Sequence, residues 1–184
     1  LKAAVQRFRE SNNPAVTLFR DIFSALIVVS VIALVLYSLS GTWPPMVVPE
    51  SPSMIPHINI GDVLFIQSPN YTRIVTNKEG VALNYVMFED YGDVILYKPD
   101  GSTTRTPIIH RAMYWVEAGD QMPGGKPAPF AGYITKGDNN PGFDQTRIVQ
   151  YPVKPEWVIG VAKIKVPYVG WVTLIFDQIK QWIR

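Results

Sequence analysis

The longest apolar run of the chain, residues 22–39, predicts a helix that crosses a membrane. It carries no formal charge, and its apolar side chains are interrupted only by small or uncharged polar residues, Ser24, Ser30, Tyr37 and Ser38. Eighteen helical residues at about 1.5 Å each span roughly 27 Å, close to the hydrocarbon thickness of a bilayer. A helix packed on a soluble core has a polar face, and this run has none. We therefore predict a transmembrane anchor over residues 22–40.

The charges on either side of this run predict its orientation. Four basic residues precede it, namely Lys2, Arg7, Arg9 and Arg20. No lysine or arginine occurs from Gly41 to Thr72. By the positive-inside rule, residues 1–21 form a cytoplasmic segment and the chain after the anchor lies outside. A cleavable signal sequence is the alternative. Because the run is longer than the usual apolar core of such sequences and no small-x-small site precedes its end, we favour a permanent, single-pass anchor.

Beyond the anchor, short runs rich in β-branched and aromatic residues alternate with turn residues. The runs that predict strands are residues 62–67, 93–97, 108–116, 133–135 and 158–166. Two stretches between them, residues 68–91 and 117–132, have the character of surface insertions. No long helical period separates the runs. The pattern predicts a mostly β domain over residues 41–167.

The end of the chain returns to a helical pattern. Its apolar residues recur at steps of three and four, at Trp171, Leu174, Ile175, Ile179, Trp182 and Ile183. This spacing predicts a C-terminal amphipathic helix within residues 168–184. Two placements suit its apolar face: against the β domain, or in the membrane interface, where tryptophans and a basic end are common.

The composition of the chain excludes several classes of function. Of its 184 residues, 47% are hydrophobic and only 17% are charged, which argues against a disordered chain. A net charge of +2 leaves no basic stripe for neutralising phosphates, so we expect no nucleic-acid partner. Cysteine is absent, which excludes thiol catalysis, cysteine-ligated zinc and disulfides.

The candidate chemistry begins shortly after the anchor. Two serines separated by one residue, Ser51 and Ser53, lie in a proline-rich segment that would present a hydroxyl as a nucleophile. The chain has two histidines, and histidine is the usual general base near neutral pH. We expect His57, which follows a proline, to be at the surface. His110 lies in an apolar run, where a histidine most often belongs to the core.

Two aspartates supply candidate carboxylates. Asp138 and Asp144 follow the predicted strand 133–135 in a polar stretch, where single aspartates are most often turn residues. Together with Ser53 and His110 they complete a nucleophile, a base and a group that orients the base. A metal site is a weaker alternative. Two histidines without a defined spacing or an obvious third ligand make a poor metal signature, so we expect no metal and no cofactor.

Three separated blocks, in this order, resemble the type I signal peptidases. The blocks are Ser51-Pro52-Ser53-Met54-Ile55-Pro56 with Gly61-Asp62, then Ile109-His110-Arg111, and then Lys136-Gly137-Asp138-Asn139-Asn140 with Asp144. The resemblance is to the Ser-His branch found in archaea and in the endoplasmic reticulum complex, whose catalytic subunit is called SEC11. It implies a signal-peptidase-like β catalytic domain with one N-terminal transmembrane helix. The predicted C-terminal helix and the two insertions lie outside the resemblance.

The resemblance also implies a role for each matching residue. Ser53 is expected to attack the scissile carbonyl. His110, where the bacterial branch has a lysine, is expected to take the proton and return it to the leaving amine. Asp144 is expected to orient His110, with Asp138 supporting the site or sharing that role. The Ser51 hydroxyl and the Ser53 amide are expected to form an oxyanion hole.

Two further expectations concern the neighbours of Ser53. Met54 and Ile55 are expected to line the substrate cleft. The family commonly has glycine between the two serines, whereas this chain has Pro52, which fixes the backbone φ angle there. The position of the Ser51 hydroxyl therefore depends on how the chain accommodates that proline.

The implied function is that of a signal peptidase I, a membrane-bound serine endopeptidase of Ser-His-Asp type that cleaves signal peptides from exported preproteins after small-x-small sites. Preproteins and membrane lipid are the implied partners, with accessory subunits or a translocon as further ones. The implied location is the cell membrane, or the endoplasmic reticulum membrane in a eukaryote, with the catalytic domain extracytoplasmic.

Two alternatives stay open at this point. In the first, the reaction is the same but the base is Lys136. In the second, the chain is a membrane-tethered, non-catalytic β module that binds a protein partner. A separation of more than about 7 Å between the Ser53 hydroxyl oxygen and both His110 nitrogens would favour the module, because catalytic partners approach hydrogen-bond reach.

Overall fold

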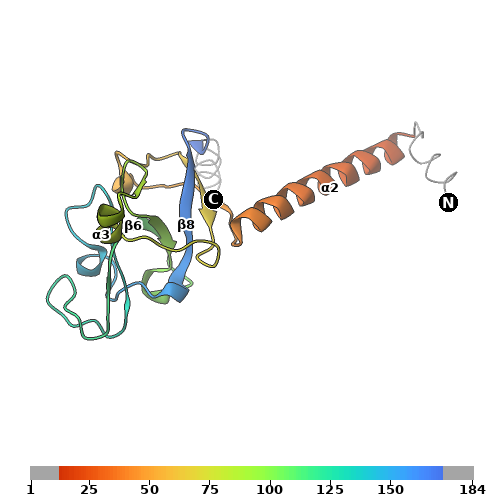
Figure 1. The fold of residues 1–184 in the computed structure, drawn as a ribbon. Coiled ribbons are helices and arrows are strands. Elements are labelled where there is room, and N and C mark those ends of the chain that lie inside the picture. Colours follow the sequence, from red (N-terminus) through yellow and green to blue (C-terminus); the bar gives the residue numbers. More distant parts are fainter. Residues whose placement is uncertain (1–12, 172–184) are drawn as a thin grey trace, which may run out of the picture. The chain divides into compact units, whose positions relative to one another are not determined.

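The computed structural model describes residues 13–171 and divides the chain into two compact units, Leu1–Leu39 and Ser40–Arg184. The main element of the first unit is the helix α2 (Pro14–Ser40) (Figure 1). Its 27 residues correspond to a length of about 40 Å. Among the helices of the described residues, α2 alone is long and apolar enough to cross a membrane. This agrees with the predicted anchor.

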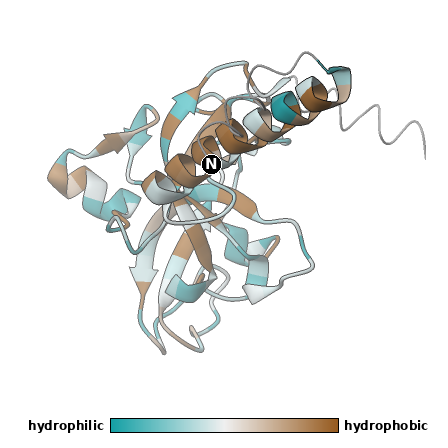
Figure 2. Ribbon diagram, turned by 90° about the vertical axis from the view of Figure 1, so that its right-hand side faces the viewer, coloured by the Kyte–Doolittle hydropathy of each residue, from teal (hydrophilic) through white to brown (hydrophobic). Residues whose placement is uncertain are grey.

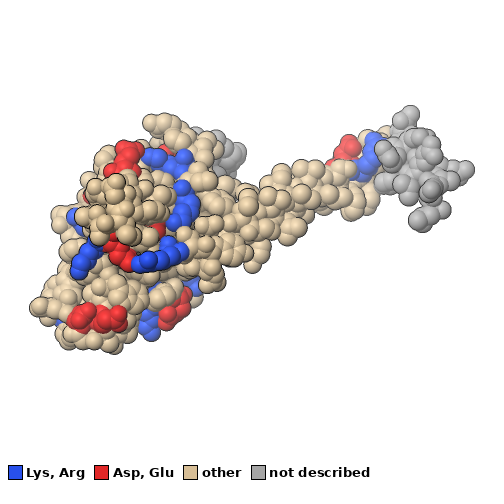
Figure 3. Space-filling view, viewed as in Figure 1, with Lys and Arg blue, Asp and Glu red and all other residues tan. Residues whose placement is uncertain are grey.

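The surface of α2 is apolar along most of its length. Apolar colouring dominates the helix in Figure 2, and the charged side chains in Figure 3 are confined to its beginning, where Arg20 and Asp21 form an ion pair. The helix begins earlier than the apolar run predicts. Pro14 occupies its first position, where a missing N–H costs nothing, and the Asn13 side chain accepts a hydrogen bond from the Ala15 N–H at 3.0 Å.

The second unit is built on a six-stranded sheet in which neighbouring strands are antiparallel. In spatial order its strands are β1 (Met46–Val47), β2 (Val63–Gln67), β8 (Val158–Val166), β5 (Val94–Tyr97), β6 (Ile108–Val116) and β7 (Gly132–Lys136). The predicted mostly β domain is confirmed, and the bounds of β6 and β8 are those predicted. The predicted C-terminal amphipathic helix lies almost entirely outside the described residues, as does most of the predicted cytoplasmic segment.

The first predicted insertion contains secondary structure of its own. The helix α3 (Asn77–Leu83) is followed by a hairpin of β3 (Val86–Met87) and β4 (Asp90–Tyr91), and α3 lies beside β6 (Figure 1). A capping box starts the helix. The Thr76 hydroxyl accepts from the Glu79 N–H at 3.3 Å, and the Glu79 carboxylate accepts from the Thr76 N–H at 2.9 Å. Seven residues are too few to show a helical period in the sequence.

Both faces of β5 are buried, which explains its unbroken apolar sequence. Ile95 and Tyr97 pack into one hydrophobic cluster, and Val94 and Leu96 pack into another. The core of the unit therefore lies on the two sides of this central strand.

The pairing of β5 with β6 decides where the candidate site forms. Ile95 lies opposite His110, and Val94 lies opposite Arg111. Because residues directly opposite one another share a face of the sheet, His110 emerges on the Tyr97 side and Arg111 emerges on the other side. The side chains of His110 and Arg111, which are consecutive in β6, therefore lie on opposite faces of the sheet.

Candidate active site

Three side chains far apart in the sequence form a continuous hydrogen-bonded line. The Ser53 Oγ lies 2.9 Å from the His110 Nε2, and the His110 Nδ1 lies 2.7 Å from the Asp144 Oδ2. His110 and Asp144 are buried, whereas Ser53 is partly exposed. An ionised carboxylate only accepts hydrogen bonds, so the His110 Nδ1–H donates to Asp144 and the Nε2 accepts from the Ser53 hydroxyl. The base and the nucleophile are aligned for proton transfer.

Asp144 has a second donor, the hydroxyl of Tyr97. This hydroxyl donates to the Asp144 Oδ2 at 2.9 Å and accepts from the Thr135 hydroxyl at 3.2 Å. The Gln145 side-chain amide donates to the Thr135 hydroxyl at 3.5 Å, and its oxygen accepts from the Thr135 N–H. Burial, followed by the negative charge of Asp144, raises the pKa of Tyr97 well above its ordinary value. Tyr97 therefore keeps its proton and holds the carboxylate in place.

A single helical turn presents the nucleophile. Residues Pro52–Met54 form the 3₁₀ turn η1, with Ser51 as its N-terminal cap and Pro52 at its first position. A proline is suited to that position, because its φ angle is already helical and its missing N–H has no partner there. The Ser51 Oγ lies 3.0 Å from the Ser53 Oγ. Since the Ser53 proton is committed to His110, the Ser51 hydroxyl is the donor of this pair. Pro52 is thus compatible with a hydroxyl beside the nucleophile.

The loop after β7 packs directly against this turn. The Asn139 N–H donates to the Ser53 carbonyl oxygen at 2.8 Å, and the Asn139 side-chain amide donates to the Pro52 carbonyl oxygen at 3.1 Å. Gly137 permits the close approach. A Cβ atom there would lie 2.7 Å from the Ser53 carbonyl oxygen and 2.8 Å from the His110 Nε2. Any side chain at this position would displace the base or the nucleophile.

Asp138 belongs to a different cluster from Asp144. Its carboxylate accepts from the Arg111 Nε at 2.9 Å and from the Arg111 Nη2 at 2.7 Å, and it contacts the His57 Nδ1 at 2.8 Å. Arg111 is fully buried. The two aspartates thus have separate tasks: Asp144 contacts His110, and Asp138 balances the charge of Arg111.

The structure differs from the prediction for one neighbour of the nucleophile. Met54 was expected to line a cleft, but its side chain is fully buried and packs with Ile58 and Leu64 in the core. It follows Ser53 at the end of η1, and this turn directs it inwards. Ile55 remains partly exposed.

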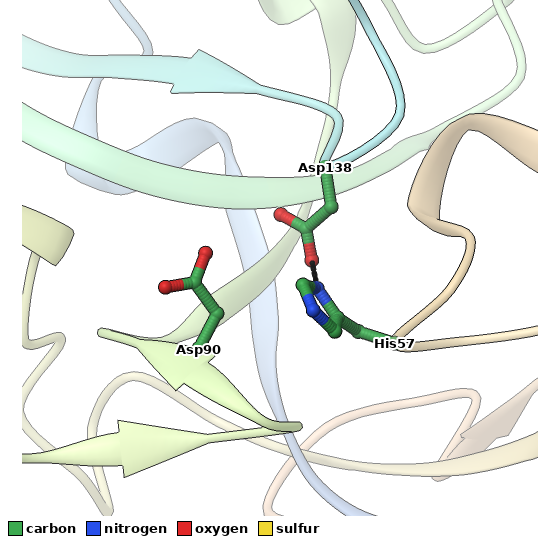
Figure 4. A group of neighbouring side chains, drawn as sticks. All are labelled: His57, Asp90 and Asp138. Carbon is green, nitrogen blue, oxygen red and sulfur yellow. Dashed lines mark hydrogen bonds and ion pairs between the residues drawn. The ribbon is translucent and has the colours of Figure 1, made fainter.

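The alternatives named from the sequence can be compared with this geometry. Lys136 lies on β7 opposite Arg111, while His110 occupies the position next to the Ser53 hydroxyl. The 2.9 Å contact is also far shorter than the separation that would favour a non-catalytic module. Within residues 13–171, one group of side chains could converge on a metal ion, namely His57, Asp90 and Asp138 (Figure 4). It contains neither His110 nor Asp144.

Sequence reasoning did not find Tyr97, Thr135 and Gln145, and it gave no separate role to Asn139 and Arg111, which it named only as members of two blocks. Tyr97 could have been noticed, because a buried tyrosine in an apolar strand needs a partner for its hydroxyl. The other contacts depend on pairings between distant segments, which the residue pattern does not reveal.

The arrangement provides what acyl transfer through a serine requires. It has a hydroxyl in contact with a neutral imidazole nitrogen, a carboxylate that fixes the imidazole tautomer, and a second hydroxyl beside the reacting oxygen. In the described residues every buried side-chain nitrogen and oxygen has a hydrogen-bond partner. The site is therefore preorganised.

Several known proteins that are similar to this chain share one name. No protein-family model matches the chain. The chain is 31% identical over 159 residues to the signal peptidase complex catalytic subunit SEC11 of Schizophyllum commune, covering 78% of this chain and 70% of the relative. The corresponding subunit of Pyricularia oryzae is 30% identical over 143 residues, covering 76% and 67%, and that of Colletotrichum graminicola is 27% identical over 149 residues, covering 79% and 71%.

These matches extend over most of the chain and of each relative, which is far more than a shared short motif. The chain therefore belongs to the family of signal peptidase catalytic subunits represented by SEC11.

Proposed function

We propose that this protein is a membrane-anchored serine endopeptidase that removes signal peptides from exported preproteins, with Ser53 as the nucleophile, His110 as the general base and Asp144 as the group that orients His110. One observation carries the assignment: the unbroken line of hydrogen bonds from the Ser53 hydroxyl through His110 to Asp144, at 2.9 and 2.7 Å. Membership of the SEC11 family supports it, since the relatives are named as signal peptidase catalytic subunits.

The proposed reaction follows from the placement of protons in this line. The Ser53 Oγ attacks the scissile carbonyl carbon and its proton passes to the His110 Nε2. His110 then donates that proton to the leaving amine as the peptide bond breaks, which leaves an acyl group on Ser53. A water molecule then attacks this ester and gives a proton to His110, and His110 returns the proton to the Ser53 Oγ as the bond between that oxygen and the acyl carbon breaks, which releases the acid and regenerates the serine. Asp144 stabilises the imidazolium that forms in each half of the reaction.

The negative charge that develops on the carbonyl oxygen needs donors close to Ser53. We assign this role to the Ser51 hydroxyl and the Ser53 backbone amide. In the resting site the Ser51 hydroxyl donates to the Ser53 Oγ at 3.0 Å. After attack, the Ser53 Oγ and the oxyanion are bound to the same substrate carbon. The Ser51 hydroxyl therefore needs only to rotate about its own C–O bond to donate to the oxyanion. Such a donor acts on the transition state more than on the resting substrate.

The cellular setting is part of the proposal. The apolar helix α2 anchors the chain as a single span, with residues 1–21 in the cytoplasm and the catalytic domain, residues 41–167, on the other side. The substrates are preproteins with a small-x-small site, and the chain works in the membrane with partner subunits, as the names of its relatives suggest. In a eukaryote this membrane is that of the endoplasmic reticulum.

Reconstitution of the full chain with a signal-bearing preprotein tests the proposal. We expect Ser53→Ala and His110→Ala to lower kcat by about 10³-fold or more while leaving the unfolding temperature nearly unchanged. Ser102→Ala, a serine in another loop, should cleave at the wild-type rate. Turnover retained in the Ser53 variant would contradict the assignment of the nucleophile.

The alternative base can be separated in the same assay. Lys136→Met should retain cleavage if His110 is the base, and should abolish it if Lys136 is. Cleavage lost in the Lys136 variant but retained in His110→Ala would show that Lys136 is the general base and His110 is not.

A further inference from the structure

His57 is the one histidine for which the proposed reaction has no use. It lies between η1 and β2, four residues after the nucleophile, and its Nδ1 lies 2.8 Å from the Oδ2 of Asp138, which is 81 residues away in the sequence. Figure 4 shows the imidazole directed at this carboxylate from the segment that carries the nucleophile. The His57 side chain is mostly covered, and that of Asp138 is buried. This is a specific contact and not a surface encounter.

Asp138 is a fixed point in the structure. Its two oxygens accept from the Nε and Nη2 of Arg111, whose Nη1 donates to the carbonyl oxygens of Met87 at 3.0 Å and Gly92 at 2.8 Å. A guanidinium held by these four hydrogen bonds has little freedom, so the carboxylate paired with it is also held. This carboxylate is an acceptor, and the His57 Nδ1–H is therefore the donor.

The contact completes a two-point attachment of the nucleophile segment. At one point, Asn139 binds the carbonyl oxygens of Ser53 and Pro52. At the other, Asp138, the residue before Asn139 in this loop, binds His57. Residues 52–57 are thus fastened at both ends to the short loop 138–139. The Lys165 ammonium adds a bond to the His57 carbonyl oxygen at 2.7 Å.

The neighbourhood favours an ion-pair network over a metal site. The oxygens of Asp90 and Asp138 and a nitrogen of His57 lie within 4.8 Å of one another, which is a spacing that metal ligands can adopt. However, the buried Arg111 guanidinium already binds both oxygens of Asp138, and its Nε lies 3.6 Å from Asp90. A divalent cation among these groups would be repelled by that charge. The cationic position is already filled by arginine.

We propose that His57 is a positioning residue for Ser53: its bond to Asp138 fixes the segment 52–57 so that the hydroxyl of Ser53 meets the Nε2 of His110. This inference rests on the proposed function for its effect on catalysis. His57 itself touches no reacting atom. Its contribution is geometric, because a displacement of about 1 Å between nucleophile and base lowers the rate by up to about 10²-fold.

Three substitutions at one position test the proposal in the full-length protein. In His57→Asn, the side-chain amide nitrogen takes the place of the Nδ1 and keeps the bond to Asp138. His57→Ala has no donor, and the donor of His57→Gln lies one bond further out. We expect kcat on a signal-bearing preprotein to fall about tenfold or more in the alanine and glutamine variants, with KM within about twofold, and to stay within about twofold of wild type in the asparagine variant.

A second measurement does not depend on activity. The Asn139 amide proton is bonded to the Ser53 carbonyl oxygen, so its hydrogen exchange reports the attachment of the nucleophile segment. We expect exchange to accelerate in His57→Ala and to remain at the wild-type rate in His57→Asn. If the wild type cleaves no preprotein, the proposed function fails while the exchange rates still decide the positioning role.

The remaining outcomes separate positioning from metal binding. Asp90→Asn is the matched control, because Asp90 shares the cluster but makes no bond to His57. It should cleave at the wild-type rate, and neither zinc nor a chelator should change any rate. Equal losses in the Asp90 and His57 variants, reversed by zinc, would replace the proposal with a metal site. Unchanged kcat and unchanged exchange in His57→Ala, or equal losses in the alanine and asparagine variants, would overturn it.

Discussion

The hydroxyl of Tyr97 offers a sharp test of the buried network behind the candidate base. Tyr97→Phe removes one oxygen and leaves the ring in its place between the strands. The lost hydrogen bond runs to the carboxylate of Asp144 at 2.9 Å, and the Thr135 hydroxyl loses the acceptor that it has at 3.2 Å. A hydrogen bond to a charged group contributes about 1.5–3 kcal/mol, so the variant should be less stable by that amount. For a domain of this size the unfolding temperature should fall by roughly 3–12 °C.

The same substitution should change how stability depends on pH. Burial and the nearby Asp144 raise the pKa of Tyr97 well above its ordinary value, whereas tyrosine in an unfolded chain ionises near pH 10. The stabilising contribution of Tyr97 is therefore fully present below about pH 10. Above it the unfolded chain loses a proton that the folded chain retains, and this contribution falls by about 1.4 kcal/mol per pH unit until the folded pKa is reached.

Thermal unfolding of the full chain in detergent, followed by tryptophan fluorescence, measures both effects. The difference between wild type and Tyr97→Phe should be largest at pH 8 and should shrink between pH 10 and pH 11. Other tyrosines are common to both proteins and cancel in this difference. Tyr71→Phe, at an exposed tyrosine, should stay within a degree of wild type throughout. A difference that is independent of pH would refute the buried hydroxyl–carboxylate contact.

Three further substitutions test the geometry around the nucleophile by preprotein cleavage. Asp144→Asn should lower kcat by roughly 10³- to 10⁴-fold with KM little changed, because the amide no longer fixes the imidazole tautomer; a loss below tenfold would exclude this role. Gly137→Ala should abolish cleavage and lower the unfolding temperature, since its Cβ would lie 2.8 Å from the His110 Nε2; wild-type behaviour would show that the loop yields. Ser51→Ala should lower kcat by about 10²- to 10³-fold at unchanged unfolding temperature, and an effect confined to KM would argue against an oxyanion donor.

The strands were the most predictable part of the fold. Both β6 and β8 are rich in β-branched and aromatic residues. Pro107 and Glu117 flank β6, and Pro167 follows β8, so their bounds follow from local preference. The start of α2 does not follow from the apolar run, which begins only at Ile22. Residues 14–21, which include Arg20 and Asp21, belong to the same helix, and the cap that begins it is Asn13.

The sequence predicted which residues belong to the site, but not which hydrogen-bond partner each of them has. Ser53, His110 and Asp144 could be named from their blocks, but the division of labour between Asp138 and Asp144 could not. It depends on the face of β6 from which each partner emerges, and a register shift of one residue would exchange the two. Met54 illustrates the same limit, since its place beside the nucleophile gave no sign that η1 turns its side chain into the core.

Strand β6 links the two networks of the site. His110 emerges on one face, where Tyr97 and Asp144 fix its tautomer, and Arg111 emerges on the other, where it holds Asp138. One network sets the tautomer and the direction of the base, and the other sets the position of the nucleophile relative to that base. Because adjacent residues of a strand move together, a shift of β6 displaces the base and the support of the nucleophile in concert. Motions of the sheet therefore change the distance between the nucleophile and the base very little. Serine activation depends more steeply on this distance than on any other quantity.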